Sequence, residues 1–134
     1  MPIKGSVRRA LVHEEVTASV LGAFFRVYTT LGYGFLESVY ASALAHEMTK
    51  RALRVEREVS INVCYDGRIV GVFRADVLVN RAVVVEVKAT RARTDVDAQQ
   101  LLNYLRGTDL EVGLLLHFGP RPTFRRLISS DERR

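Results

Sequence analysis

Apolar side chains recur at helical spacing through the first third of the chain. Residues 14–34 read EEVTASVLGAFFRVYTTLGYG, and Gly32 and Gly34 follow the last periodic position, as glycines at a helix end do. A second helix is predicted from about residue 36 to residue 51. The apolar positions are Val16, Val20, Phe24, Val27, Tyr28 and Leu31 in the first helix, and Leu36, Val39, Tyr40, Ala43, Leu44 and Met48 in the second.

The period changes after the second helix. Residues 55–79 are rich in β-branched side chains, and Asp66-Gly67 is a strong hairpin signal. A third strand, residues 82–88, is predicted after a short turn at Asn80-Arg81. Helical spacing returns in TDVDAQQLLNYLRGT, with Thr94 and Asp95 as cap candidates and an end near Gly107.

The last part of the chain predicts strands again. VGLLLHF, residues 112–118, is typical of a buried strand, and TFRRLI, residues 123–128, is a candidate for one more. No repeat or linker interrupts the pattern. We therefore expect one mixed α/β domain over residues 1–134, with a core from about residue 14 to residue 128.

Composition narrows the setting. A chain of 134 residues with 48% hydrophobic residues can bury a core without covalent staples. The single cysteine, Cys64, cannot form an internal disulfide, and no Cys/His cluster is spaced for zinc, which favours a reducing, cytoplasmic location. No apolar run approaches the roughly 18 residues of a membrane span, and residues 1–16 lack the apolar core of a signal peptide. The net charge of +5 favours an acidic partner such as nucleic acid.

Three charged residues interrupt strands that are otherwise apolar: Asp76 in one, Glu86 and Lys88 in the next. Alternate residues of a strand share a face, so Glu86 and Lys88 point the same way. A three-residue loop, Asn80 to Ala82, would place Asp76 directly opposite Glu86, with Cβ atoms about 4.5–5.5 Å apart. A two-residue loop would instead send the two carboxylates to opposite faces.

Two carboxylates side by side repel unless a cation lies between them. A hard divalent ion such as Mg²⁺ could bind Asp76, Glu86 and the carbonyl of Val87, and Lys88 would add a positive charge beside it. The alternative is a solvated face of an antiparallel sheet, with ion pairs such as Arg74 with Glu86. The Asp…Glu-x-Lys spacing alone does not separate these two interpretations.

Further motifs lie on either side of the charged strands. Gly34, Glu37 and Tyr40 form a Gly-x-x-Glu-x-x-Tyr pattern, and Gln100 and Tyr104 lie one turn apart on the later helix. Besides the signature at Gly34, Glu37 and Tyr40, the chain carries the motifs Asp76, Glu86-Val87-Lys88, and QLLNYL before GLLLHFG. With these motifs it resembles the GxxExxY protein family of the PD-(D/E)XK nuclease-like superfamily. The resemblance covers residues 14–124.

The resemblance implies a restriction-endonuclease-like core: a helix, an antiparallel three-stranded meander, a helix and a further strand. It also implies that Asp76 and Glu86 bind metal and that Lys88 is the catalytic lysine. Glu37 resembles the acidic residue that the first core helix often supplies. Gln100 and Tyr104 resemble a Gln-x-x-x-Tyr pair beside the active site. The chain departs from the pattern at Ala75, where the superfamily has proline, and at His117, where the family has asparagine.

Each remaining candidate has a structural alternative. Tyr40 and Tyr104 are either half-buried core aromatics or substrate contacts, and Glu37 could instead stabilise a helix start. Arg91 and Arg93 are placed to bind phosphate, or are arginines of an exposed loop. Asp95 and Asp97 are expected to cap a helix, and no metal role is assigned to the three histidines, His13, His46 and His117.

The function expected from these residues is a Mg²⁺- or Mn²⁺-dependent phosphodiesterase. It would hydrolyse nucleic acid, DNA in preference to RNA, with a metal-activated water. The alternative is a module on the same fold that binds nucleic acid or protein without catalysis, because fold does not establish function. A membrane partner is not expected, and a homodimer is left open.

Overall fold

The computed structural model describes residues 13–92 and 95–129. The predicted helices and strands are confirmed within a few residues of their expected bounds, and the candidate last strand is present. Thr94, one of the two predicted caps, lies outside the described residues. The elements are α2 (Glu14–Leu31), α3 (Glu37–Lys50), β1 (Val55–Tyr65), β2 (Arg68–Val79), β3 (Val83–Lys88), α4 (Asp95–Arg106), β4 (Val112–Phe118) and β5 (Pro122–Ile128).

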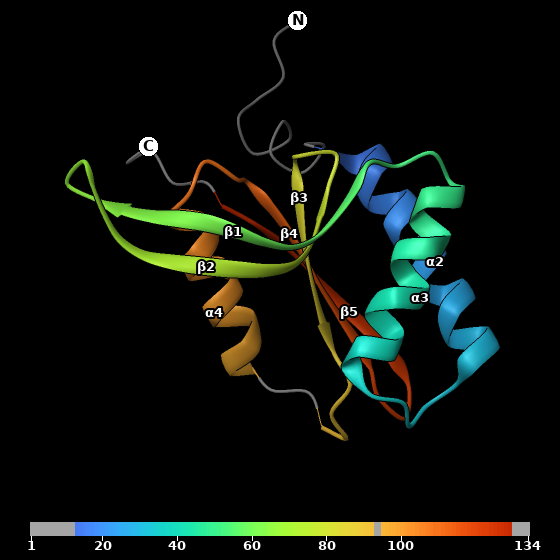
Figure 1. Ribbon diagram of the computed structural model, residues 1–134. Coiled ribbons are helices and arrows are strands. Elements are labelled where there is room, and N and C mark those ends of the chain that lie inside the picture. Colours follow the sequence, from blue (N-terminus) through green and yellow to red (C-terminus); the bar gives the residue numbers. More distant parts are fainter. Residues whose placement is uncertain (1–12, 93–94, 130–134) are drawn as a thin grey trace, which may run out of the picture.

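The strands form one mixed sheet in the order β1-β2-β3-β4-β5 (Figure 1). The first three strands pair antiparallel as a meander. β4 then pairs with β3 in parallel and β5 pairs with β4 antiparallel, so α4 is the crossover between the two parallel strands. The expected α/β class, with a three-stranded meander and a further strand, is confirmed.

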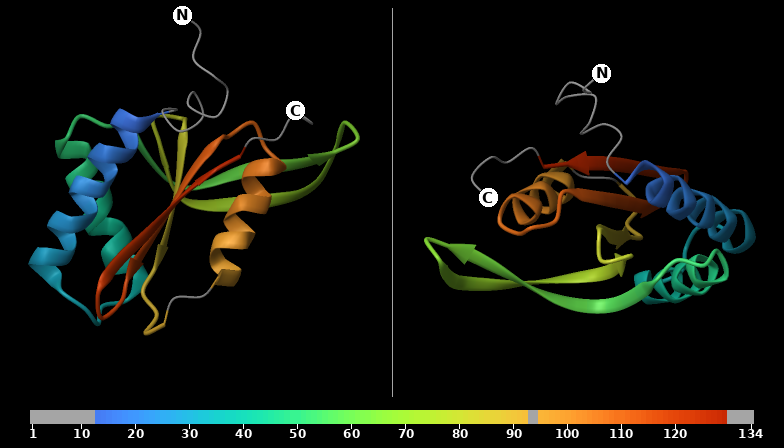
Figure 2. Two further views of the ribbon diagram at one scale, coloured as in Figure 1. Left: turned by 180° about the vertical axis from the view of Figure 1, so that it is seen from behind. Right: turned by 90° about the horizontal axis from the view of Figure 1, so that it is seen from above.

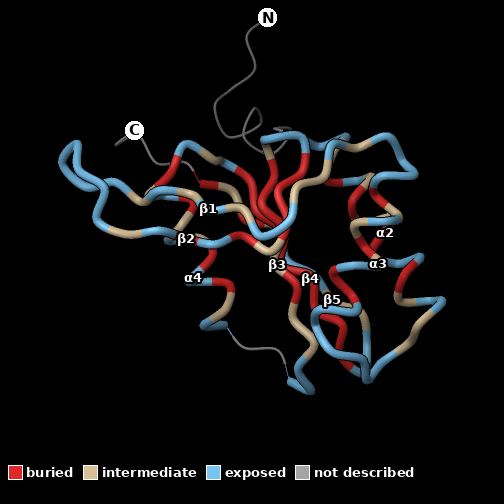
Figure 3. Tube along the Cα trace, in the orientation of Figure 1, coloured by how far each residue is buried: buried red, intermediate tan, exposed pale blue. Residues whose placement is uncertain are grey.

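Helices cover both faces of this sheet (Figure 2). α2 and α3 pack on one face, where Phe24, Tyr40 and Leu44 meet the valines of β2 and β3. α4 packs on the other face, where Leu101 and Leu105 meet Leu115. Each face therefore has its own apolar core, and β3 and β4 are buried between them (Figure 3). A strand covered on both faces reads as a nearly continuous apolar run.

The start of α3 departs from the prediction. Leu36 is the N-cap residue and is 74% exposed, and Val39 is also exposed, although the sequence pattern predicts both on the apolar side of the helix. The helix buries Tyr40, Ala41 and Leu44 instead. Leu36 precedes the first helical turn, so the periodicity of the helix does not apply to it.

Two short turns set the geometry of the meander. Asp66 and Gly67 both have positive φ, 52° and 73°, as a two-residue hairpin turn of type I′ requires. The connection between β2 and β3 contains three residues, because Val79 pairs with Val83. Asn80 fixes this connection: its side-chain oxygen accepts a hydrogen bond from Arg54 N–H, and its own N–H donates to the Arg54 carbonyl, both at 2.8 Å.

Candidate active site

The β2–β3 ladder ends at the predicted carboxylate pair. Paired residues run from Val79 with Val83 to Val77 with Val85, so the next opposed positions are Asp76 and Glu86. Asp76 N–H donates to Glu86 Oε1 at 3.2 Å, and Val87 N–H donates to Asp76 Oδ2 at 2.8 Å. Side-chain carboxylates therefore replace the backbone acceptors at this point. The three-residue loop, and the facing carboxylates that it predicts, are confirmed.

The alternation of side chains between the two faces of the sheet is interrupted in β2 at Asp76. Ala75 belongs to the core on the α4 side, whereas Val77 belongs to the core under α2 and α3, although residues two apart in a regular strand share a face. On the neighbouring strand, Glu58 has a φ of 52° and lies between the paired positions Arg57 and Val59. A distortion through both strands thus brings the Asp76 carboxylate to the edge of β3.

Burial and the neighbouring carboxylate control the charge of Glu86. Desolvation, followed by repulsion from Asp76, raises the pKa of Glu86 from 4.5 to about 8, while Asp76 N–H and the charge of Lys88 act in the opposite direction. Glu86 is therefore protonated at pH 7 in the metal-free protein.

Lys88 lies one alternate position beyond Glu86, on the same face of β3. Its Nζ lies 4.0 Å from Oδ1 of Asp97, at the start of α4, and its side chain is 31% exposed. Asp97 was predicted to cap α4. It is instead a residue of the first helical turn, and its carboxylate faces Lys88 because α4 packs on the face of the sheet that carries Glu86 and Lys88.

A small cavity of about 20 Å³ opens beside these residues, between the sheet and α4. This volume holds a water molecule or an ion, so a polymeric substrate would have to lie across its mouth. Tyr104 is half-buried and stacks on Phe73, with ring centroids 4.2 Å apart and planes 9° apart. The lining residues are Phe73, Glu86, Lys88, Asp97, Gln100, Leu101, Tyr104 and Leu115.

Glu37 and Tyr40 do not line this cavity. Glu37 is exposed in the first turn of α3, where its negative charge stabilises the helix by interacting with the positive end of the helix dipole. Tyr40 is fully buried, stacks on Phe118 and donates its hydroxyl hydrogen to the Gly32 carbonyl at 2.5 Å. Tyr40 is therefore a core residue, and its buried ring is not available as a substrate contact. Within the signature, Tyr40 joins the end of α2 to α3.

Arginines and a histidine surround the site. Arg74 pairs with Glu58 at 3.5 Å, not with Glu86, so the suggested surface ion pair does not form. Arg91 is exposed just beyond β3, and Arg93 lies outside the described residues. His117 pairs in register with Lys88 on β4, and its Nε2 lies 2.7 Å from the Thr90 carbonyl oxygen. His117 thereby fixes the segment that follows Lys88.

Hard oxygen ligands meet at the carboxylate pair. Across residues 13–92 and 95–129, no cluster of three or more His, Cys, Asp or Glu side chains forms around a common point. An ion at this pair would take its other ligands from backbone carbonyls and water, as Mg²⁺ commonly does. Within the same ranges, no helix is long and apolar enough to cross a membrane.

Sequence reasoning missed Asp97, Phe73 and the contact of His117 as parts of this neighbourhood. The spacing of Asp97, three residues before Gln100 on one helix face, was the available signal. Phe73 gave none, because its place depends on how the hairpin folds over α4.

Comparisons with known proteins agree with this fold. The family model described as the PD-(D/E)XK nuclease superfamily matches residues 14–127. A solved structure titled "Crystal structure of SSO0001" superposes with a TM-score of 0.54 at 20% sequence identity. The superposition covers 94% of this chain and 63% of that one, so the present chain spans less than two thirds of its length. At this identity the likeness supports the fold alone. No curated protein matches the sequence.

Proposed function

The chain belongs to the PD-(D/E)XK nuclease superfamily, and from this premise we propose that it hydrolyses phosphodiester bonds of nucleic acid at Asp76, Glu86 and Lys88. Membership suggests nuclease activity on a nucleic-acid substrate, and nucleases of this superfamily generally use divalent metal ions. The observation that carries the proposal is the facing carboxylate pair with Lys88 two residues further along β3.

Asp76 and Glu86 fit a divalent metal ion. The two carboxyl groups lie close together, and burial, followed by repulsion from Asp76, raises the pKa of Glu86 to about 8. Two carboxylates, the Val87 carbonyl and water form a hard-oxygen set suited to Mg²⁺ or Mn²⁺. In an extended strand the N–H and C=O of one residue lie on the same edge, so the Val87 N–H bond to Asp76 supports a carbonyl on that side. When bound, the ion would polarise the phosphate and lower the pKa of a water ligand.

Lys88 is the proposed catalytic lysine. Its side chain lies on the same strand face as Glu86, and its Nζ is 4.0 Å from Oδ1 of Asp97. At that separation the pair is weak enough for the ammonium to turn to a phosphate oxygen. A fixed positive charge there would stabilise the negative charge that develops in the transition state, an effect typically worth 10²–10³ in kcat.

Gln100 and Tyr104 are the proposed substrate contacts. Both line the cavity at the carboxylates, and Tyr104 presents a half-buried phenol held by its stack on Phe73. The exposed Arg91 is a proposed phosphate contact outside the cavity. For Glu37 we retain only an indirect role through the start of α3.

The finer assignments form part of the same proposal. We place the chain in the GxxExxY family on its Gly34, Glu37 and Tyr40 signature. DNA is the proposed substrate and the cytoplasm the proposed location. A homodimer remains open to a measurement of mass in solution.

The test is a cleavage assay on single- and double-stranded DNA and RNA, each with Mg²⁺, Mn²⁺ or EDTA. Cleavage that requires a divalent ion is expected. Lys88→Ala should lower turnover at least a hundredfold, whereas Lys50→Ala, an exposed lysine of α3 paired with Glu47, should leave it unchanged. Cleavage that survives in Lys88→Ala would show that the activity lies elsewhere or belongs to a contaminant. Binding without cleavage in every condition would favour the non-catalytic module.

A further inference from the structure

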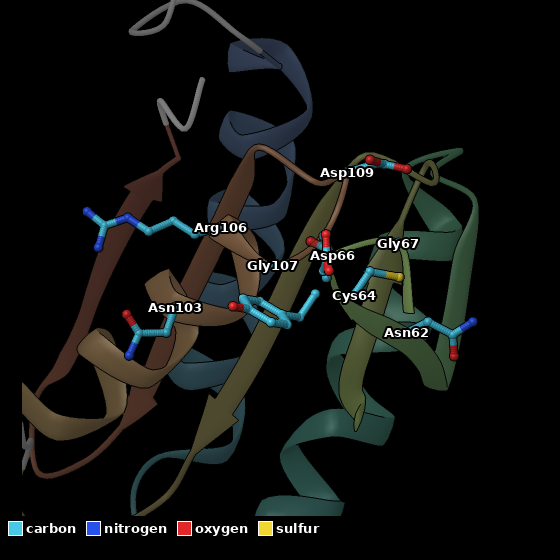
Figure 4. Close-up of a pocket in the computed structure, with 10 residues that line it drawn as sticks. Asn62, Cys64, Asp66, Gly67, Asn103, Arg106, Gly107 and Asp109 are labelled. Carbon is cyan, nitrogen blue, oxygen red and sulfur yellow. The ribbon is translucent and has the colours of Figure 1, made fainter. Parts of the chain in front are cut away.

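A second and larger cavity lies at the far end of α4, away from the carboxylates. Its volume is about 750 Å³, within the range of sites for small organic ligands. The tip of the β1–β2 hairpin supplies one wall, with Asn62, Tyr65 and Asp66. The end of α4 and the turn after it supply the other, with Asn103, Arg106 and Asp109 (Figure 4).

The two walls are joined to each other. Cys64 N–H in β1 donates to the Gly107 carbonyl after α4, at 3.5 Å. A side chain at Gly107 would meet the Val63 methyl group at 3.0 Å, so glycine allows the helix end to lie against the hairpin. The cavity is therefore built between two elements that contact each other, and it is not a gap around a loose loop tip.

The chemistry of the walls favours a nucleobase over a phosphate. Two carboxylates, Asp66 and Asp109, would repel an anion, and in Figure 4 the Arg106 side chain extends away from Asp66. Carboxylates and side-chain amides, here those of Asn62 and Asn103, are groups that hydrogen-bond to the edges of bases. The Asn103 oxygen accepts a hydrogen bond from Gln99 Nε2 at 2.9 Å, so Asn103 would offer a base its N–H groups. Exposed aromatic rings are where unpaired bases stack.

Tyr65 supplies such a ring. It is 74% exposed at the hairpin tip. Other large aromatic residues near the sheet, such as Phe73 and Tyr104, stack on a neighbour, whereas no aromatic ring lies against Tyr65 among residues 13–92 and 95–129. An exposed tyrosine at a cavity mouth offers a base one face to stack on, and a carboxylate or amide of the lining would hydrogen-bond to its edge.

α4 contributes residues to both cavities. Gln100 and Tyr104 line the cavity at the carboxylates, and Asn103 and Arg106 line this one. Six residues of helix, from position 100 to position 106, span about 9 Å at 1.5 Å per residue. A single strand that follows α4 away from the scissile phosphate would therefore reach the cavity within a few nucleotides.

We propose that this cavity binds an unpaired nucleotide of the substrate, a few positions from the bond that is cut, with its base stacked on Tyr65. The inference rests on the proposed nuclease function and adds a requirement for single-stranded structure on one side of the cleavage site. The ligand chemistry is a nucleobase on a single strand, which DNA and RNA share.

The experiment measures binding of single-stranded oligonucleotides of two to ten nucleotides, as DNA and as RNA, to Lys88→Ala in Mg²⁺, by fluorescence anisotropy. Affinity should rise in a step once the oligonucleotide spans both cavities. Adding Tyr65→Ala should remove that step and cost at least about fivefold in affinity for the longer oligonucleotides. Asn103→Ala should weaken the same step. Tyr33→Ala is the matched control, because it removes another exposed tyrosine, located between α2 and α3. It should leave the affinity and its dependence on oligonucleotide length unchanged.

The outcomes separate the two proposals. Equal length dependence in Tyr65→Ala, Asn103→Ala and Tyr33→Ala would overturn the nucleotide-binding cavity and leave the nuclease proposal standing. No binding of any DNA or RNA by Lys88→Ala, together with no cleavage by the wild-type protein, would overturn both. A step in DNA but not RNA, or the reverse, would support the cavity and identify the sugar that it accepts. Melting temperatures that match the parent protein would confirm that the variants are folded.

Discussion

Glu86 determines how the charge of the site depends on pH. Its folded-state pKa of about 8, against 4.5 for an unperturbed glutamate, means that the folded protein keeps a proton that the unfolded chain releases. Between these two values the folded state binds more protons, so the free energy of unfolding of the metal-free protein falls as pH rises and the contribution is fully lost above about pH 8. The direction is opposite to that of a carboxylate stabilised by a salt bridge.

This dependence gives a prediction for chemical denaturation in EDTA. The free energy of unfolding from urea titrations should be lower at pH 9 than at pH 6. Glu86→Gln, which cannot ionise, should lose most of that difference, and titration of other groups should remain as a shared background. Equal pH dependence in Glu86→Gln and the wild-type protein would show that Glu86 is not the protonated carboxyl.

A second prediction at the residue scale concerns Asp76. Millimolar Mg²⁺ or Mn²⁺ should raise the melting temperature of the wild-type protein, because a ligand of the folded state stabilises it. Asp76→Asn should abolish this response while its amide oxygen still accepts the Val87 N–H bond. At pH 9 without metal, the variant should be more stable than the wild-type protein, because one of two repelling charges is gone.

The exposed Glu111→Gln serves as the charge-matched control for Asp76→Asn and should keep the full metal response. A wild-type melting temperature indifferent to both metals would contradict the metal site and leave the carboxylate pair with a structural role only.

At the scale of elements, periodicity and turn chemistry predicted most of the fold. Helical spacing located α2 and α3, and Asp66-Gly67 located the hairpin, because these signals are local. The Asp76–Glu86 pairing was predictable as soon as the loop was taken as three residues, since loop length sets the register.

The contacts that sequence did not predict depend on how elements pack. Asp97 and Lys88 lie on different elements, and only the position of α4 against the sheet brings them to 4.0 Å. Tyr40 belongs to a functional-looking signature, yet its burial follows from the packing of α3 on α2. The larger cavity joins residues about 40 positions apart, so no local pattern could reveal it.

The packing of α4 on β4 gives a prediction at this scale. Gly113 in β4 lies under the helix, where an added methyl group would meet Leu101 and Leu105 side-chain atoms at 3.1–3.2 Å. Gly113→Ala should push α4 from the sheet, lower the free energy of unfolding by about 1–3 kcal/mol and reduce cleavage, because α4 carries Asp97, Gln100 and Tyr104.

Gly71→Ala in β2 is the matched control, because a methyl group there meets no atom within 4 Å. Urea titration and the cleavage assay check both variants. A Gly113→Ala protein as stable and as active as Gly71→Ala would show that the helix tolerates the extra volume.

At the scale of the whole molecule, the charge of +5 bears on association with nucleic acid. Each phosphate neutralised by an arginine steepens the fall of affinity with salt. Arg91→Ala should therefore weaken binding and reduce the slope of log affinity against log salt concentration by roughly 0.7–0.9. Arg26→Ala on α2, on the opposite face of the sheet from α4, should reduce the affinity far less. Equal slopes in the two variants would exclude Arg91 from the phosphate path.

The bond from Val87 N–H to the Asp76 carboxylate bears on how such a chain could lose its activity over evolution. Replacing Asp76 with an aliphatic residue would leave a backbone donor without its acceptor inside the sheet, so selection for folding alone would retain an acceptor at this position. Among the described residues Lys88 makes one long ion pair, so selection for folding would place little constraint on it once catalysis no longer mattered. In proteins descended from this one, a retained aspartate at position 76 would therefore say little about catalytic activity. A retained lysine at position 88 would be the better indicator of an active enzyme.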